Sequence, residues 1–101
     1  MSFENKTLVS EKEIQKQLLG LEGWEYDSNK KELNRVWVFK KFVPTMAFVR
    51  KLTEVMDGNN HHSDIKLDSR RKTLTVSVTT HSENAVTQAD LDFVKSVNSI
   101  E

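Results

Sequence analysis

The alternation of apolar and small polar residues in TLTVSVTTH, residues 73–81, is the feature that most constrains the fold of this chain. Side chains on a β-strand point to alternate faces of the sheet, so the apolar residues would share one side: Leu74, Val76 and Val78. The other side would carry hydroxyl groups, with His81 at the end of the row. A strand with one apolar and one polar face indicates a sheet that is covered on one side only, which favours antiparallel pairing.

Two stretches rich in turn residues divide the strands into hairpins. DSNKK, residues 27–31, precedes a run of β-branched and aromatic residues in Glu32–Phe39. SRRK, residues 69–72, separates the alternating Ile65 and Leu67 from the 73–81 strand. Because Asp, Asn and Ser favour turns, we expect Trp24–Asp27 to pair with Glu32–Phe39, and the 65–68 strand with the 73–81 strand.

Helix signals mark the first and central helices. Ser10 and Glu13 form a capping box at the start of the first helix, and Gly20 is placed to end it. Pro44 suits the first turn of the central helix, where a missing N–H has no cost. Apolar residues then recur at the spacing of one helical face until Gly58, which ends the pattern.

A third helix is predicted to start at Thr87, with Asp90 three residues later as its capping partner and three valine and leucine side chains facing inward: Leu91, Val94 and Val97. The element order is therefore helix, two strands, helix, two strands, helix. We expect an α+β fold, with a four-stranded antiparallel sheet and three helices packed on one face.

Composition excludes several classes of protein. The chain has 101 residues, which suits one domain over residues 1–101, and it lacks cysteine. Fifteen basic and fifteen acidic residues leave no net charge, so we expect no direct nucleic-acid binding, although a local charged patch is compatible with this balance. No apolar run approaches the ~20 residues of a membrane span, and the first residues lack the pattern of a signal peptide, so we expect a cytoplasmic protein without membrane contact.

Two adjacent histidines, His61 and His62, follow the glycine that ends the central helix, and three interpretations are open. They can be a solvated pair without a role. They can contribute to a zinc site with Asp57, Asp64 or His81, although the local spacing of known zinc motifs is missing. They can also act as acid–base groups with His81 if the two segments converge, since imidazoles titrate near neutral pH.

DGNNHHSD followed by TTHSENAVTQAD resembles the pattern of the pterin-4a-carbinolamine dehydratases. The shared features are an acidic residue before His-His, a histidine at a strand end, and an aspartate in the last helix. GWEY, RVWVFKKF and FVPTMAFVRKLTEVMD are similar to the upstream elements of that family, and the family fold agrees with the predicted element order. The chain departs from the usual pattern at Asp57, where Glu is common, at Ser63, where Pro is common, and in the stretches 69–72 and 82–86.

The resemblance implies a function and roles for individual residues. The reaction is the dehydration of 4a-hydroxytetrahydropterin to quinonoid dihydropterin, without a metal or cofactor, which recycles the pterin cofactor of aromatic amino acid hydroxylases. His61 and His81 are the implied acid–base pair, and His62 is the implied pterin contact. Further substrate-binding residues carried over by position are Asp57, Thr80, Ser82 and Asp90.

Alternative interpretations remain for several of these features. Asp90 can be a helix cap alone, and Trp24 and Trp37 can be core residues. The rival function is a non-catalytic protein–protein interaction module, since relatives act as dimerisation cofactors of a transcription factor through a helix that corresponds here to Pro44–Met56. The family precedent also implies a homodimer or homotetramer, which exposure of Met46 or Val49 would favour.

Overall fold

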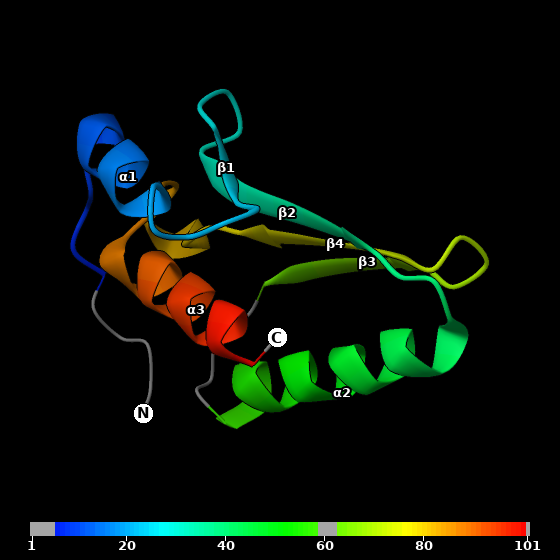
Figure 1. Ribbon diagram of the computed structural model, residues 1–101. Coiled ribbons are helices and arrows are strands. Elements are labelled where there is room, and N and C mark those ends of the chain that lie inside the picture. The colour runs from blue at the N-terminus through cyan, green and yellow to red at the C-terminus, as the bar shows by residue number, and fades with distance from the viewer. Residues whose placement is uncertain (1–5, 59–62, 101) are drawn as a thin grey trace.

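A four-stranded antiparallel sheet and three helices form the molecule, in a computed structural model that describes residues 6–58 and 63–100 (Figure 1). The strands are β1 (Glu25–Asp27), β2 (Glu32–Val38), β3 (Asp64–Asp68) and β4 (Thr73–Val78). The helices are α1 (Glu11–Leu18), α2 (Phe42–Gly58) and α3 (Gln88–Ser99), with a short 3-10 helix η1 (His81–Glu83) after β4. The sheet order is β1-β2-β4-β3, so the two predicted hairpins meet through the β2–β4 pair.

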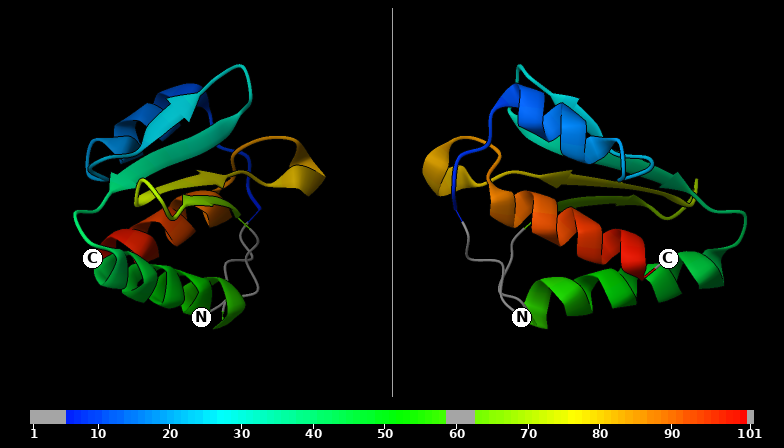
Figure 2. Two further views of the ribbon diagram at one scale, coloured as in Figure 1. Left: turned by 90° about the vertical axis from the view of Figure 1, so that its right-hand side faces the viewer. Right: turned by 60° about the vertical axis from the view of Figure 1, so that its left-hand side comes forward.

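The three helices lie on one side of the sheet, as the two views of Figure 2 show, so the predicted fold class is confirmed. Between the layers, Trp37 packs with its ring centroid 5.8 Å from that of Trp24 and 5.1 Å from that of Phe48. The α3 residues predicted to face inward are fully buried in the same core: Leu91, Val94 and Val97. Trp24 and Trp37 are therefore core residues, as one of the two interpretations held.

The alternation in β4 produces a covered and an open face, as predicted. The apolar set is completely buried under the helices: Leu74, Val76 and Val78. Their neighbours Thr75 and Ser77 are half-buried on the open face. On the same face of β2, Val36, the partner of Thr75, is 56% exposed, and Val38, the partner of Thr73, is 75% exposed.

A polar cluster ties the end of α3 to the sheet. Asn98 Oδ1 accepts hydrogen bonds from Trp24 Nε1 at 2.8 Å and from Arg35 Nη1 at 2.7 Å, and the Arg35 guanidinium lies 4.3 Å from the Trp37 ring centroid. Gly23 makes room for Arg35, since a Cβ there would lie 2.5 Å from Arg35 Nε and the backbone φ is +90°. The tryptophan, the arginine and the asparagine are thereby held in one arrangement.

Two element boundaries differ from the predictions by two residues or more. α2 begins at Phe42, two residues before Pro44. The N–H groups of a helix's first turn have no acceptor within the helix, so Pro44, which has no N–H, fits there without the loss of a hydrogen bond. β4 ends at Val78 rather than continuing to His81. Beyond Val78 the chain folds back on itself, since Thr80 N donates to Ala85 O at 3.1 Å and Ala85 N donates to Thr80 O at 3.4 Å.

The predicted capping box of α3 is complete, and at α1 the hydrogen bond to the Ser10 side chain is present. Ser10 Oγ accepts from Glu13 N at 3.2 Å, while the Glu13 carboxylate accepts from Gln17 Nε2 at 3.3 Å. At α3, Thr87 N donates to Asp90 Oδ2 at 2.8 Å, which confirms Asp90 as a capping partner. Among the described helices, none has the combination of length and apolar character that crossing a bilayer demands.

Candidate active site

The predicted site residues come from two parts of the chain. Asp57, Thr80, His81, Ser82 and Asp90 lie in the described part of the structure. The histidine pair His61 and His62 lies outside the described residues. The described parts of the site are therefore the end of α2 before the pair, the start of β3 after it, and the loop that carries His81.

The described ends on either side of the histidine pair lie next to each other. Ser63 Oγ donates to Met56 Sδ at 3.3 Å, and Asp57, exposed in the last turn of α2, directly follows that methionine. β3 then starts at Asp64, which is paired with Ser77 near the end of β4. The chain therefore enters β3 at the same end of the sheet where β4 leads into the His81 loop, and the two predicted segments have adjacent anchors.

The loop that follows β4, residues 79–87, holds His81 and Ser82 outward. Both side chains are exposed on η1. The correction to the sequence analysis is that His81 does not end the polar row of a strand. It begins a 3-10 turn, which Asn84 closes in a left-handed conformation with φ of 50°. Thr79 fastens the start of the loop by donating from its hydroxyl to Lys31 O at 2.7 Å.

Asp90 is a fully buried carboxylate at the base of this loop, and threonines surround it. Its Oδ2 atom accepts from Thr80 Oγ1 at 2.7 Å, from Thr87 N at 2.8 Å and from Thr87 Oγ1 at 3.4 Å. The two threonine hydroxyls also share a 2.8 Å hydrogen bond. Burying a carboxylate is unfavourable unless several donors compensate it, and these donors do so.

The network connects the start of α3 to the residue next to His81. Thr80 precedes His81 directly, so its hydroxyl–carboxylate hydrogen bond fixes the backbone from which the His81 side chain projects. Sequence reasoning identified Thr80 and Asp90 as site residues but did not identify Thr87 as their third partner. The T-x-x-D spacing at the helix start was the available signal, although it indicated a cap and not a link to the loop.

In residues 6–58 and 63–100, no three histidine, aspartate or glutamate side chains are grouped so that they could hold a metal ion. The zinc interpretation also requires the histidine pair, so it stays a prediction. The arrangement that the described residues do provide is an exposed imidazole on a hydrogen-bonded loop, which follows β4 at the end of the sheet where β3 begins.

Fold and site together define a class of protein, and comparison with known proteins agrees. The protein-family model for pterin 4 alpha carbinolamine dehydratase matches residues 7–100. The chain belongs to this family.

Curated relatives have the same extent as this chain. A protein of Sulfolobus acidocaldarius, provisionally named pterin-4-alpha-carbinolamine dehydratase, is 38% identical over 93 residues, which cover 92% of this chain and 98% of the relative. A protein of Nostoc punctiforme with the same provisional name is 35% identical over 92% of this chain and 96% of its own.

Solved structures support the same fold. A transcriptional coactivator/pterin dehydratase from Brucella melitensis superposes with a TM-score of 0.84 at 26% identity, over 93% of this chain and 98% of that chain. A pterin dehydratase-like protein, described as a RuBisCO assembly factor in the alpha-carboxysome, has a TM-score of 0.64 at 15% identity over 76% of this chain and 87% of that one. At that identity the second likeness concerns the fold alone.

Proposed function

We propose that this protein catalyses the dehydration of 4a-hydroxytetrahydropterin to quinonoid dihydropterin. The observation that carries the proposal is the pairing of Asp64 with Ser77, which anchors the segment after the histidine pair beside the strand that leads to His81. Membership of the dehydratase family supports the substrate class. The exposed position of His81 supports access by a small molecule.

The reaction needs one acid and one base and no redox chemistry. The C4a–O bond breaks, a proton from the acid converts the departing hydroxide into water, and the base removes the proton from N5 as the C4a=N5 double bond forms. One imidazolium and one neutral imidazole supply these two groups near pH 7. After turnover the two have exchanged protonation states, and exchange with solvent restores them.

We assign the acid–base roles to His61 and His81, and pterin contact to His62. Asp57 lies at the end of α2, exposed and four residues before His61, where it would orient an imidazole. Ser82 is exposed on η1 and would be available to hydrogen-bond the pterin. Asp90 is fully buried, so we assign it and Thr80 the role of holding the His81 loop rather than contacting the substrate.

The test is a stopped-flow assay of 4a-carbinolamine dehydration with the purified wild-type protein and three alanine variants. His61→Ala and His81→Ala should each lower kcat by ~100- to 10,000-fold, the usual contribution of an acid–base group. His62→Ala should raise KM more than it lowers kcat, because it removes binding common to the ground and transition states. Asp57→Glu, which introduces the residue usual in the family, should keep or raise kcat.

Folding is the control, followed by circular dichroism and by the mass of each variant in solution. The proposal fails if the wild-type rate equals that of the uncatalysed reaction, or if all three alanine variants keep wild-type kcat and KM. We place the activity in the cytoplasm, where it would return pterin to an aromatic amino acid hydroxylase.

A second candidate function is a non-catalytic protein–protein interaction module. The observation in its favour is that a structural relative is described as both a transcriptional coactivator and a pterin dehydratase. In this chain Met46 and Val49 of α2 are half-buried, so the surface beside the core stripe of α2 is partly apolar. A wild-type rate equal to the uncatalysed rate in the stopped-flow assay would favour this function.

A further inference from the structure

Charge is strongly segregated along this electrically neutral chain. Residues 40–51 and 66–72 contain eight basic side chains and one acid, Asp68, so these nineteen residues carry a charge of +7. The rest of the chain, with seven basic and fourteen acidic residues, carries −7. A net charge of zero therefore conceals a protein with one strongly positive region.

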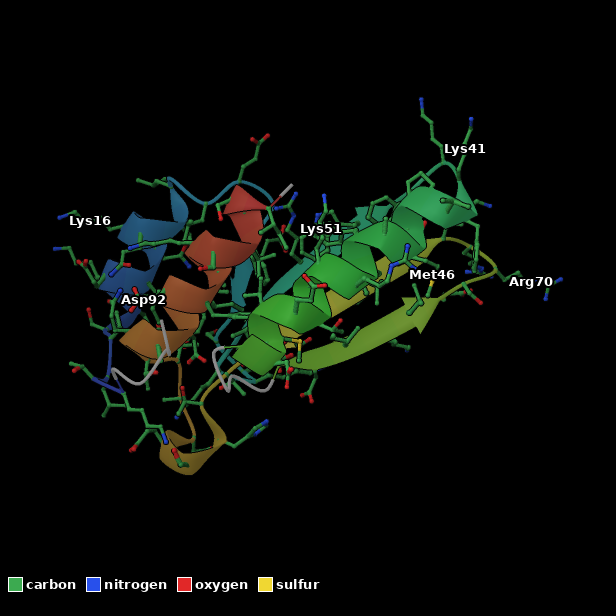
Figure 3. All side chains as sticks on the ribbon, turned by 90° about the horizontal axis from the view of Figure 1, so that it is seen from below. Lys16, Lys41, Met46, Lys51, Arg70 and Asp92 are labelled. Carbon is green, nitrogen blue, oxygen red and sulfur yellow. The ribbon has the colours of Figure 1, made fainter. Side chains whose placement is uncertain are left out.

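The fold brings five of these eight cations to one end of the molecule. The connection from β2 to α2 and the β3–β4 turn are joined by a hydrogen bond from Phe39 N to Lys72 O at 2.9 Å. Figure 3 shows Lys41 and Arg70 projecting at this end, opposite Lys16 of α1. We name this surface the basic end, defined by five residues: Lys40, Lys41, Arg70, Arg71 and Lys72.

The basic end is highly exposed. Its residues are exposed except for Lys72, which is half-buried. Arg71 lies 3.9 Å from Asp68 while its side chain remains 82% exposed, so this ion pair holds the arginine only weakly. These cations are therefore available to an anionic partner.

Exposed apolar side chains border the basic end on both sides of the sheet. Val38, on the open face of β2, is 75% exposed. Phe42 and Val43 begin α2, in the helix layer, and are 53% and 72% exposed. An apolar-and-basic surface of this kind suits a partner that offers apolar groups together with its negative charge.

A recess next to the basic end gives the surface a defined anion position. It has a volume of about 210 Å³ on the open face of the β3–β4 hairpin, and it is lined by two cations, one carboxylate and two hydroxyl-bearing side chains: Lys66, Arg71, Asp68, Thr73 and Thr75. Two cations and two hydroxyl-bearing side chains around one hollow can receive a carboxylate side chain. The recess adjoins the open face that carries Val38.

The geometry points to the basic end as a docking surface for an acidic protein segment that also carries apolar side chains and binds in an extended conformation. The segment would cross the end of the molecule from Val38 to Phe42 and place carboxylates on Lys40, Lys41 and Arg71. With a molecular width of 26 Å and ~3.3 Å per extended residue, about eight residues suffice. This role is separate from the proposed dehydration, since the His81 loop lies at the other end of β4.

Other occupants fit the surface less well. A single-stranded nucleic acid would need several aromatic side chains for base stacking, and among the described residues at this surface Phe42 is the one exposed aromatic side chain. A flat bilayer cannot meet Val38 and Phe42 together, because they lie on opposite sides of the sheet. At α1, the opposite end of the molecule, Lys12 and Lys16 offset Glu11 and Glu13, so a second copy offers no acidic surface there.

The test uses a fluorescein-labelled peptide of about eight residues in which Glu alternates with Leu, and follows its fluorescence anisotropy as the whole protein is added. The double variant Lys40→Glu/Lys41→Glu should bind at least about tenfold more weakly. Lys12→Glu/Lys16→Glu makes the same change in net charge on exposed α1 positions, and its affinity should stay within about twofold of wild type.

A second pair of variants tests the apolar contribution. Phe42→Ser should weaken peptide binding by about threefold or more, while Leu19→Ser, at a residue that is 89% exposed at the end of α1, should leave it unchanged. Circular dichroism and dehydratase rate should be unaltered in all four variants. These two measurements therefore distinguish a variant that has lost the docking surface from one that has lost its fold.

Three results would overturn the proposal. The first is equal weakening by the two charge reversals, which would indicate net charge alone. The second is undiminished binding of a peptide in which Ser replaces Leu. The third is tighter binding of single-stranded DNA, or of phosphatidylcholine vesicles containing phosphatidylglycerol, than of the Glu-Leu peptide.

Discussion

Replacing Asp90 by alanine should be among the most destabilising single substitutions in this protein. The change removes a fully buried carboxylate and leaves two donors of short hydrogen bonds, Thr80 Oγ1 at 2.7 Å and Thr87 N at 2.8 Å, without their acceptor. Each buried donor that loses its partner costs about 1–3 kcal/mol, so for the two donors we expect a total loss of about 2–6 kcal/mol. That is a large part of the ~5–15 kcal/mol by which a domain is usually stable.

Asp90→Asn separates the charge from the shape. The amide oxygen can occupy the position of Oδ2 and accept from Thr87 N, but hydrogen bonds to a neutral acceptor are roughly half as strong as those to a carboxylate. We expect a loss of about 1–2 kcal/mol. Asp92→Asn is the matched control on the same helix, since Asp92 is half-buried and accepts from Gln88 Nε2 at 2.9 Å (Figure 3 labels it).

The assay is urea unfolding followed by circular dichroism. The unfolding free energy in water, and its slope against urea concentration, are compared between variants. Thr80→Val removes the hydroxyl while keeping the branched shape, and in a double-mutant cycle with Asp90→Asn it should show a coupling of about 1 kcal/mol. If Asp90→Ala lowers the unfolding free energy no more than Asp92→Asn does, the network does not support the loop and our account of it is wrong.

Three further predictions concern other parts of the molecule. Gly23→Ala should lower the unfolding free energy by about 1–3 kcal/mol, because its φ of +90° and the 2.5 Å approach of a Cβ to Arg35 Nε are both unfavourable; a urea midpoint equal to wild type would contradict this. Burial, followed by the charges of Glu11 and Asp27, raises the pKa of Tyr26 above 10.0. The unfolded state therefore loses the phenolic proton first, so the stability that the neutral phenol provides is complete below pH 10.0 and declines as pH rises through the folded-state pKa. Between pH 9 and 11, urea unfolding should thus show a steeper loss for wild type than for Tyr26→Phe, and parallel curves would refute it. Light scattering should give the mass of a homodimer or homotetramer, and a monomer mass at micromolar concentration would exclude this state.

Much of the fold could be predicted because the periodicity of apolar residues and the preferences of turn and capping residues act within one segment of the chain. The strict alternation around Val76 and the capping partners Thr87 and Asp90 each determine the conformation of their own segment. The end of β4 could not be predicted in the same way. Threonine at 79 and 80 favours a strand locally, but the hydrogen bonds of Thr80 with Ala85 and Asp90 turn the chain away.

The site was predicted less completely, because its support depends on contacts between distant residues. His81 was identified from its resemblance to a family pattern, and no periodicity in the chain could reveal that it begins a 3-10 turn. Likewise, the composition of SRRK, residues 69–72, indicates a turn but not what its arginines lie beside. Their proximity to the β2–α2 connection depends on the Phe39–Lys72 hydrogen bond, which local sequence does not encode.

The contacts of Asn98 have a consequence for how the chain can be trimmed or fused. A deletion that reached Asn98 would remove the acceptor shared by Trp24 and Arg35, so the last turn of α3 belongs to the folding unit even though it lies near the end of the chain. At the other end, the Gln88 N–H donates to Thr7 O at 3.0 Å, so shortening past Thr7 would release the start of α3. Affinity tags and reporter domains are therefore best attached outside these two contacts. Truncations that are meant to destabilise the fold are best made just inside them.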